Sequence, residues 1–185
     1  MTYAYESEVE KRLSEEDCLN FYHICNTPEN VIGHCREVGR VAGGLAASLN
    51  RAGYHFDEEL CRMAGYVHDI MRTYPNHGEE GAKVLLKHGF VREADLVRDH
   101  MHYDFGTIDN LTEMDLLCLA DRMVEDDQYV GLEKRIRSLI KRRGFGPEKT
   151  ELFLAKMEET KDYIKQIESI TGESFDSLFL NRDNH

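Results

Sequence analysis

The sequence predicts an all-α protein: one helical bundle that ends in a C-terminal pair of helices. Three observations support this class. Apolar residues recur with helical periodicity along most of the chain, β-branched alternating runs are absent, and residues that begin or end helices delimit the periodic segments. A chain of 185 residues buries a sizeable core without staples. We therefore expect a single domain over residues 1–185, with a core of about 27–125 and a helical extension of about 131–172.

Capping residues set the boundaries of the N-terminal helices. The segment "SEED" at Ser14 resembles a capping box, with Asp17 in the reciprocal position. Thr27 and Pro28 supply the N-cap and the first helical residue of a long helix, because proline is pre-organised for that position. Asp57 begins the next helix. The expected helices run from Ser14, from Thr27 to about Arg51, and from Asp57 to about His68–Asp69.

Glycine and threonine mark the later boundaries. Gly89 ends a short helix that begins at Gly78, and "TEMD" caps another helix at Thr112. The segment "GFGP" at 144–147 forms a turn between the last two helices. The expected helices in this half cover 78–88, 91 to about 102, 112 to about 124, 132–143 and 147–170.

Composition excludes several classes of protein and partner. The formal net charge of −12 argues against long nucleic acid or an anionic membrane as a partner, because phosphate affinity comes mainly from lysine and arginine. No run approaches the roughly 18 apolar residues of a membrane span, and the acidic N-terminus has no secretory apolar region. Five cysteines without a CxxC pair indicate reduced thiols, so we expect a cytoplasmic protein.

One basic segment departs from this acidic character. The stretch "EKRIRSLIKRR" contains Lys134, Arg135, Arg137, Lys141, Arg142 and Arg143. A solvated helix face explains such a cluster, and so does a surface that steers a substrate or partner. Both interpretations stay open from the sequence.

An aspartate lies on the apolar line of a predicted helix. Met114, Leu117 and Cys118 recur at helical spacing, and Asp121 continues the same line. Burying an unpaired carboxylate is costly, so such a residue is normally ion-paired or bound to metal. A buried salt bridge and a solvated last turn are the alternatives to a metal ligand.

Three more polar residues lie beside apolar helix faces. His34 flanks the face of the long helix, and His68 and Asp69 follow the apolar line of the next one. Adjacent helical residues project about 100° apart, so His68 and Asp69 reach one ion only at a helix end. A core histidine bonded to a carbonyl is the alternative for His34. Together with Asp121, two imidazoles and two carboxylates suit a divalent transition ion better than calcium.

The order His34, His68-Asp69, Asp121 on successive helices resembles the HD superfamily of metal-dependent phosphohydrolases. The segments "HCREV", "AGYVHDIMR" and "CLADRM" around these positions carry the resemblance, which covers about 31–124. It implies an all-helical HD-domain bundle with one or two divalent ions held by these residues. Iron, manganese, zinc, nickel, cobalt and magnesium are the candidate ions.

Some HD subfamilies bind a second metal through two further histidines. "HGEEGA" resembles the first of these motifs, with His77 as the ligand, and "LVRDHMHYDF" offers His100 or His102 as the second. The last two project about 200° apart on a helix, so one site is not expected to use both. His100 aligns better with the family pattern, beside Leu96 one turn earlier.

Two subfamilies show a closer resemblance. The six-residue set is similar to that of bacterial HD hydrolases that split dinucleoside polyphosphates such as diadenosine tetraphosphate, although only the residues 70–76 separate Asp69 from His77 and those enzymes have a longer insert. The segment "CLADRMVEDDQYVGLEKRI" and the following helix pair resemble HD domains fused to molybdenum-cofactor nucleotidyltransferase-like modules.

The resemblance implies a phosphohydrolase that cleaves a nucleotide or other small phosphoester by a metal-activated hydroxide. We expect Asp69 to bridge two metals and Arg72 to clamp phosphate as the second catalytic residue. Lys83 and Arg122 are further candidates for substrate binding, with surface or ion-pair roles as their alternatives.

Two other functions stay open from the sequence. The first is a non-catalytic metal- or nucleotide-binding regulatory module of the same fold, and the second is oxygenation at a di-iron centre. The expected partner is a small phosphorylated substrate such as a nucleotide, with no long nucleic acid and no membrane. A homodimer is compatible with the sequence.

Overall fold

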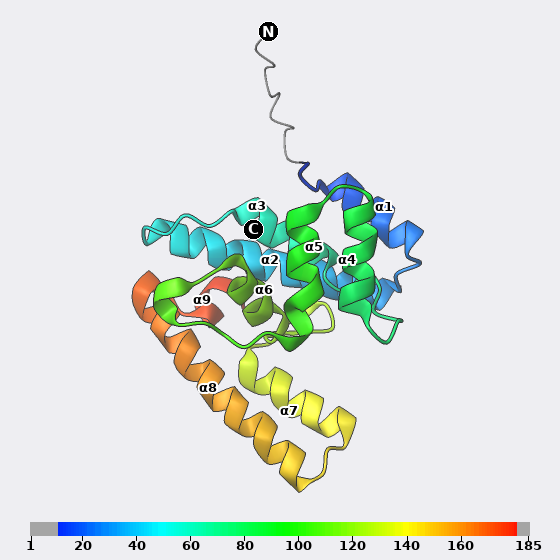
Figure 1. The fold of residues 1–185 in the computed structure, drawn as a ribbon. Coiled ribbons are helices and arrows are strands. Elements are labelled where there is room, and N and C mark those ends of the chain that lie inside the picture. Colours follow the sequence, from blue (N-terminus) through cyan, green and yellow to red (C-terminus); the bar gives the residue numbers. More distant parts are fainter. Residues whose placement is uncertain (1–10, 181–185) are drawn as a thin grey trace.

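The computed structural model describes residues 11–180, apart from the side chain of His102, and it confirms the all-α class (Figure 1). Among the described residues, no helix combines the length and the apolar character that crossing a bilayer requires. The elements in chain order are α1 (Glu15–Ile24), α2 (Glu29–Arg51), α3 (Glu58–Val67), α4 (His77–Lys87), α5 (Val91–Asp99), the 3-10 turns η1 (His100–His102) and η2 (Ile108–Asn110), α6 (Glu113–Asp121), the strands β1 (Val124–Glu125) and β2 (Gln128–Tyr129), α7 (Leu132–Arg143), α8 (Pro147–Thr171) and α9 (Phe175–Phe179).

Helix α2 runs through the middle of the bundle and contributes to two apolar clusters. Its first turns pack with α1, α3, α4 and α5 around residues such as Phe21, Leu85 and Phe90. Its later turns pack with α6, α8 and α9 around residues such as Leu45 and Ile167. Helix α7 and the first part of α8 extend away from this body, and the later part of α8 returns to it (Figure 1). Because α2 contributes buried residues to both clusters, helices pack against it on two sides, and this packing holds them in place.

Several predicted helix boundaries are confirmed by their caps. Ser14 and Asp17 form the capping box of α1. The side chain of Asp57 accepts a hydrogen bond from the backbone N–H of Leu60 at the start of α3. At the end of α7, Gly144 adopts a left-handed conformation with φ of +59°, which glycine adopts without steric cost.

Other parts of the fold differ from the sequence-based expectation. Thr27 does not cap α2: its hydroxyl donates to the carbonyl of Ile70 at 2.9 Å, and Pro28 occupies the N-cap position. Helix α6 ends at Asp121 because the chain then turns into the antiparallel hairpin β1–β2. Two-residue strands are too short to show alternation, so neither the hairpin nor the short helix α9 was predicted.

Two glycines let α2 and α3 cross in close contact. A Cβ atom added to Gly65 would lie 2.4 Å from the Cα of Gly39, and one added to Gly39 would lie 2.5 Å from the carbonyl oxygen of Arg62. No larger residue fits at either position without movement of a backbone. This crossing is about one helical turn from His34 on α2 and from His68 at the end of α3, whose ring centroids are 5.3 Å apart. The glycine contact therefore sets the distance between these two histidines.

The variant Gly65→Ala tests this crossing. We expect it to lower the free energy of unfolding by about 1–3 kcal/mol, because the added methyl group has to push two helix backbones apart. Chemical denaturation of the purified variant measures the change. Gly106→Ala is the control, since a Cβ there meets only Asn110 O at 3.7 Å. Equal stability of Gly65→Ala and wild type would contradict the proposed constraint.

Candidate metal centre

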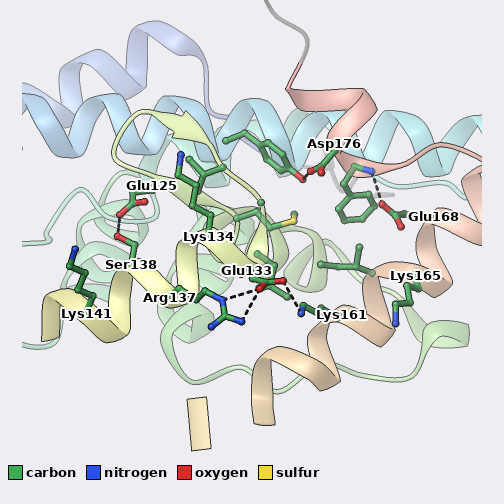
Figure 2. A pocket seen from close by; sticks show the side chains of 17 residues that line it. Glu125, Glu133, Lys134, Arg137, Ser138, Lys141, Lys161, Lys165, Glu168 and Asp176 are labelled. Carbon is green, nitrogen blue, oxygen red and sulfur yellow. Dashed lines mark hydrogen bonds and ion pairs between the residues drawn. The ribbon is translucent and has the colours of Figure 1, made fainter. Parts of the chain in front are cut away.

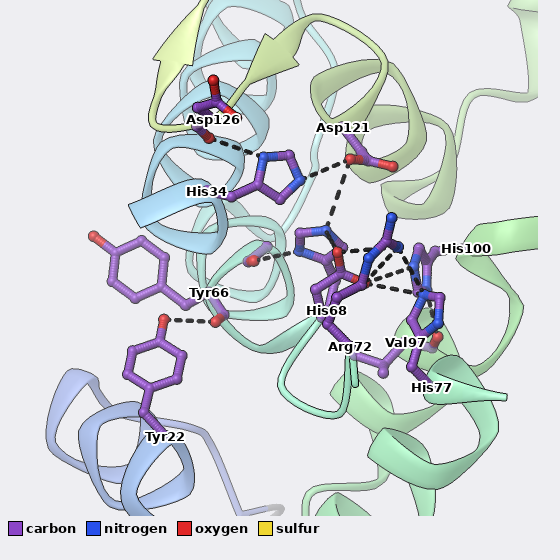
Figure 3. Close-up of polar contacts among 12 residues, drawn as sticks. Tyr22, His34, Tyr66, His68, Arg72, His77, Val97, His100, Asp121 and Asp126 are labelled. Carbon is purple, nitrogen blue, oxygen red and sulfur yellow. Dashed lines mark hydrogen bonds and ion pairs between the residues drawn. The ribbon is translucent and has the colours of Figure 1, made fainter. Parts of the chain in front are cut away.

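Six side chains singled out from the sequence lie together where several helices end (Figure 3). Helix α3 ends next to two of them, and α4, α5 and α6 each begin or end at another. Side chains at helix termini project beyond the helix, so they meet in one place without interrupting the packed core. The six residues are His34, His68, Asp69, His77, His100 and Asp121.

The first half of the cluster contains His34, His68, Asp69 and Asp121. His34 Nε2 lies 3.0 Å from Asp121 Oδ1, and His68 Nε2 lies 3.8 Å from that oxygen. His68 Nε2 is also 3.6 Å from Asp69 Oδ2. His68 is fully buried, whereas the side chain of Asp121 is 30 % exposed and opens to the surface. One ligand atom from each of His34, His68 and Asp69 lies within 4.8 Å of the others, which is close enough to hold one ion.

The second half contains Asp69, His77 and His100, whose ligand atoms also lie within 4.8 Å of one another. Asp69 Oδ1 lies 3.1 Å from His77 Nε2 and 3.6 Å from His100 Nε2. The two oxygens of Asp69 therefore face the two halves of the cluster. Arg72 adds a charge here, with Nη1 3.3 Å from Asp69 Oδ2 and 3.1 Å from His77 Nε2.

Backbone carbonyls orient three of the imidazole rings. A carbonyl only accepts hydrogen bonds, so the Nδ1 atom that contacts it carries the proton. In a neutral ring, Nε2 then keeps its lone pair and points into the cluster, as in histidines that bind metal. The three contacts are His34 Nδ1 to Asp126 O at 3.1 Å, His68 Nδ1 to Gly65 O at 2.8 Å and His100 Nδ1 to Val97 O at 2.7 Å.

Protonation explains the close contact of His34 with a carboxylate but not that of His68. Burial is the largest single influence on His34 and lowers its pKa, but the hydrogen bond with Asp121 and the charges of Asp121 and Asp69 together raise the pKa above its ordinary value, so His34 and Asp121 form an ion pair. For His68, burial outweighs the neighbouring carboxylates and lowers the pKa to about 4, so the ring is neutral at pH 7. The Nε2 atoms of His68 and His100 are buried and have no hydrogen-bond partner among the described residues. A neutral His68 thus presents a lone pair to two carboxylates.

A divalent cation fits this arrangement. Lone pairs that face carboxylate oxygens repel each other, and an unpaired buried polar atom costs about 1–3 kcal/mol. A cation between them removes both penalties, since imidazole nitrogen and carboxylate oxygen are common ligands of divalent transition ions. The residues present therefore suit a metal centre.

The cluster opens onto a cleft of about 300 Å³. His34, Asp69 and Arg72 line one part of it. Helix α7 lines another part with Arg135, Arg142 and Arg143, which belong to the basic segment recognised in the sequence. Half of that segment thus faces the same cleft as the candidate metal ligands.

A larger cavity of about 890 Å³ lies on the other side of α7 (Figure 2). Lys134, Arg137 and Lys141 line it from α7, and Lys161 and Lys165 line it from α8. None of the six candidate ligands lines this cavity. Although it is larger and carboxylates line it, neither of the two groups of metal-binding side chains found among the described residues lies in it, and we place the candidate site in the smaller cleft.

The structure brings only one of the predicted substrate-binding residues to the cluster. Arg72 lies there, whereas Lys83 forms exposed ion pairs within α4, to Glu80 at 2.8 Å and Glu79 at 3.9 Å. Arg122 donates to the carbonyl of Tyr103 and lies over the ring of Phe105. These contacts match the surface and ion-pair alternatives for Lys83 and a packing role for Arg122.

Of the two histidines proposed for one position, the structure places the side chain of His100. His100 lies in the cluster, with its ring 5.2 Å from that of His68 and 5.4 Å from that of His77. The side chain of His102 lies outside the described part of the chain.

Sequence analysis missed the groups that orient the rings. Gly65 and Val97 each lie three residues before the histidine whose Nδ1 donates to their carbonyl, so helical spacing could have predicted these two hydrogen bonds. The carbonyl of Asp126 belongs to the unpredicted hairpin and has no such signal.

Known proteins resemble this chain over more than half of its length. A sequence model described as HD domain matches residues 31–142. A protein of Methanocaldococcus jannaschii, described as an uncharacterized protein, is 30% identical over 160 residues, which cover 84% of this chain and 85% of that protein. No solved structure matches the chain.

Asp69→Asn tests the shared carboxylate. We expect metal affinity to fall by more than about 100-fold, the upper range for outer-shell partners, because both halves of the cluster lose charge. Metal content by inductively coupled plasma mass spectrometry, with circular dichroism to check folding, measures this. Asp162→Asn, at a 74% exposed side chain, is the control and should bind metal like wild type. Equal metal content in both variants would refute the site.

His77→Ala tests whether the second half holds its own ion. Two-metal sites share a bridging ligand, so removing His77 should lower the bound metal by about one ion per chain. The same metal analysis, after saturation with Mn²⁺, gives the stoichiometry, and the exposed His23 provides the control variant His23→Ala. An unchanged stoichiometry would mean that the cluster holds a single ion.

Proposed function

The chain belongs to the HD domain family, whose members are generally metal-dependent hydrolases, and on this basis we propose that it is a phosphohydrolase that cleaves a nucleotide or another small phosphoester. The observation that carries the proposal is the buried, neutral imidazole of His68, whose lone pair faces two carboxylates beside an arginine-lined cleft. Those groups suit a cation, and the cleft suits an anion.

The six cluster residues form two groups of candidate metal ligands. We propose that His34, His68, Asp69 and Asp121 hold one divalent ion, and that Asp69 shares its second oxygen with His77 and His100. A divalent ion bound there would lower the pKa of its water towards neutrality and offset phosphate charge. The backbone carbonyls that contact Nδ1 keep the imidazoles of His34, His68 and His100 in the tautomer that binds metal.

Arg72 is the residue that we assign to the phosphate. Its side chain is 38% exposed and lines the cleft, and its Nη1 atom reaches both Asp69 and His77. A guanidinium binds phosphate oxygens through two parallel hydrogen bonds, so it orients the group as well as neutralising it.

The cleft favours a small substrate. Its volume of about 300 Å³ lies at the lower end of the range for small-molecule pockets. The formal net charge of −12 leaves the local arginines as the attraction for an anion. Five free cysteines, of which Cys18, Cys35, Cys61 and Cys118 are buried, support the proposal that the protein acts in the cytoplasm.

Hydrolysis assays test the activity directly. The full-length protein, supplied in turn with Mn²⁺, Zn²⁺, Fe²⁺, Ni²⁺, Co²⁺ and Mg²⁺, is assayed on nucleotides, dinucleotides and generic phosphoesters for phosphate release. We expect at least one class to be hydrolysed by the wild type and not by Asp69→Asn. Binding of nucleotide without hydrolysis of any class would instead favour a non-catalytic regulatory module.

Arg72→Met tests the phosphate contact. We expect kcat/KM to fall by about 100-fold, as when one pre-organised donor to a developing charge is removed. Arg98→Met is a matched control, because Arg98 also pairs with an aspartate three residues earlier, Asp95, but does not line the cleft. Equal kinetic constants in the two variants would contradict the role of Arg72.

A further inference from the structure

Helix α7 divides its basic residues between two sides. Helix α7 lines the cleft onto which the metal cluster opens with residues that recur at helical spacing, namely Arg135, Leu139, Arg142 and Arg143. Lys134, Arg137 and Lys141 line the larger cavity on the other side. The cleft therefore contains three arginines besides Arg72, and they lie on an element that supplies none of the six candidate ligands.

One of these arginines has an unsatisfied buried donor. Arg135 Nη1 is buried and has no hydrogen-bond partner among the described residues. Leaving a charged donor buried and unpaired is costly, so such a group normally contacts an anion. Because the side chain lines an open cleft, its guanidinium group can turn toward an anion in the cleft, which then supplies the acceptor that the chain does not.

Nearby carboxylates only partly neutralise Arg142, the second arginine of the cleft. Arg142 lies 3.3 Å from Glu125 Oε1 and 3.7 Å from Asp126 Oδ1, and its side chain is 49% exposed. Arg143 lines the same part of the cleft and is exposed. Among the described residues, the hairpin carboxylates Glu125 and Asp126 pair with Arg142 and not with the other two α7 arginines of the cleft.

The arginine end of the cleft adjoins the metal cluster. Asp126 is close to Arg142 through its side chain, and its carbonyl accepts the hydrogen bond that orients His34. The cleft also contains Asn30, from the first turn of α2, whose N-cap Pro28 provides no side-chain hydrogen bond. An uncapped helix N-terminus adds a partial positive charge.

We propose that Arg135, Arg142 and Arg143 form a second anion subsite, and that the substrate carries a further phosphate group linked to the one that is cleaved. This inference rests on the proposed function for the place of the cleaved phosphate. Three guanidinium groups match the charge and the several acceptor oxygens of a phosphate better than those of a single carboxylate. The substrate class is therefore a compound with a phosphoanhydride or two adjacent phosphates.

Calorimetric titration tests the second subsite without requiring turnover. The full-length protein as purified, with its metal content determined, is titrated with inorganic phosphate and with inorganic pyrophosphate. We expect pyrophosphate to bind at least about tenfold more tightly, and Arg135→Met to remove about tenfold of that affinity, since a hydrogen bond to a charged group is lost. Arg137→Met removes the same charge from the other side of α7 and should change the affinity by less than about twofold.

Two further variants keep the test decisive. If Arg135→Met does not fold, the exposed Arg142→Gln provides the same comparison, and Arg135→Lys shows whether charge without the guanidinium fork is enough. Equal loss in the Arg135 and Arg137 variants, or no preference for pyrophosphate, would overturn the subsite. Absence of hydrolysis in the assays above, together with the Arg135-dependent affinity, would count against the proposed function but retain the subsite.

Discussion

The arrangement of the site depends on where each imidazole carries its proton. His68 and His100 are buried and contact a carbonyl through Nδ1, so Nε2 points toward the carboxylates of Asp69 and Asp121. Burial keeps His68 neutral, so no proton on Nε2 offsets the repulsion between its lone pair and the two carboxylates. A bound cation resolves it, and the proposed metal centre follows from this requirement.

The helical scaffold places these groups with few special features. The candidate ligands lie at or near helix ends, except His34, which lies within α2. Gly39 and Gly65 allow α2 and α3 to approach closely, and this approach brings His34 near His68. The hairpin after α6 places the carbonyl of Asp126 beside His34 Nδ1. Glu37, also on α2, anchors that hairpin by accepting a hydrogen bond from the backbone of Tyr129 at 2.9 Å.

Much of this site was predictable because its residues break an apolar pattern. Asp121 continues an apolar line, and His68 and Asp69 follow another, so local periodicity already singles them out. The close helix crossing and the carbonyl of Asp126 depend on contacts between distant segments, which local patterns do not contain. The same limit applies to the basic segment: its sequence does not show which cavity each face meets, although Arg135 and Arg137 lie on opposite sides of α7 in the structure.

The most direct measurement is a two-dimensional ¹H–¹⁵N correlation of the histidine rings in labelled, metal-depleted protein at pH 7, before and after addition of Zn²⁺. The account predicts that His68 is a neutral ring with its proton on Nδ1. It also predicts that the Nε2 resonances of His34, His68 and His100 shift on Zn²⁺ addition, while that of the exposed His23 does not. A His68 ring protonated on Nε2, with no response to Zn²⁺, would contradict it.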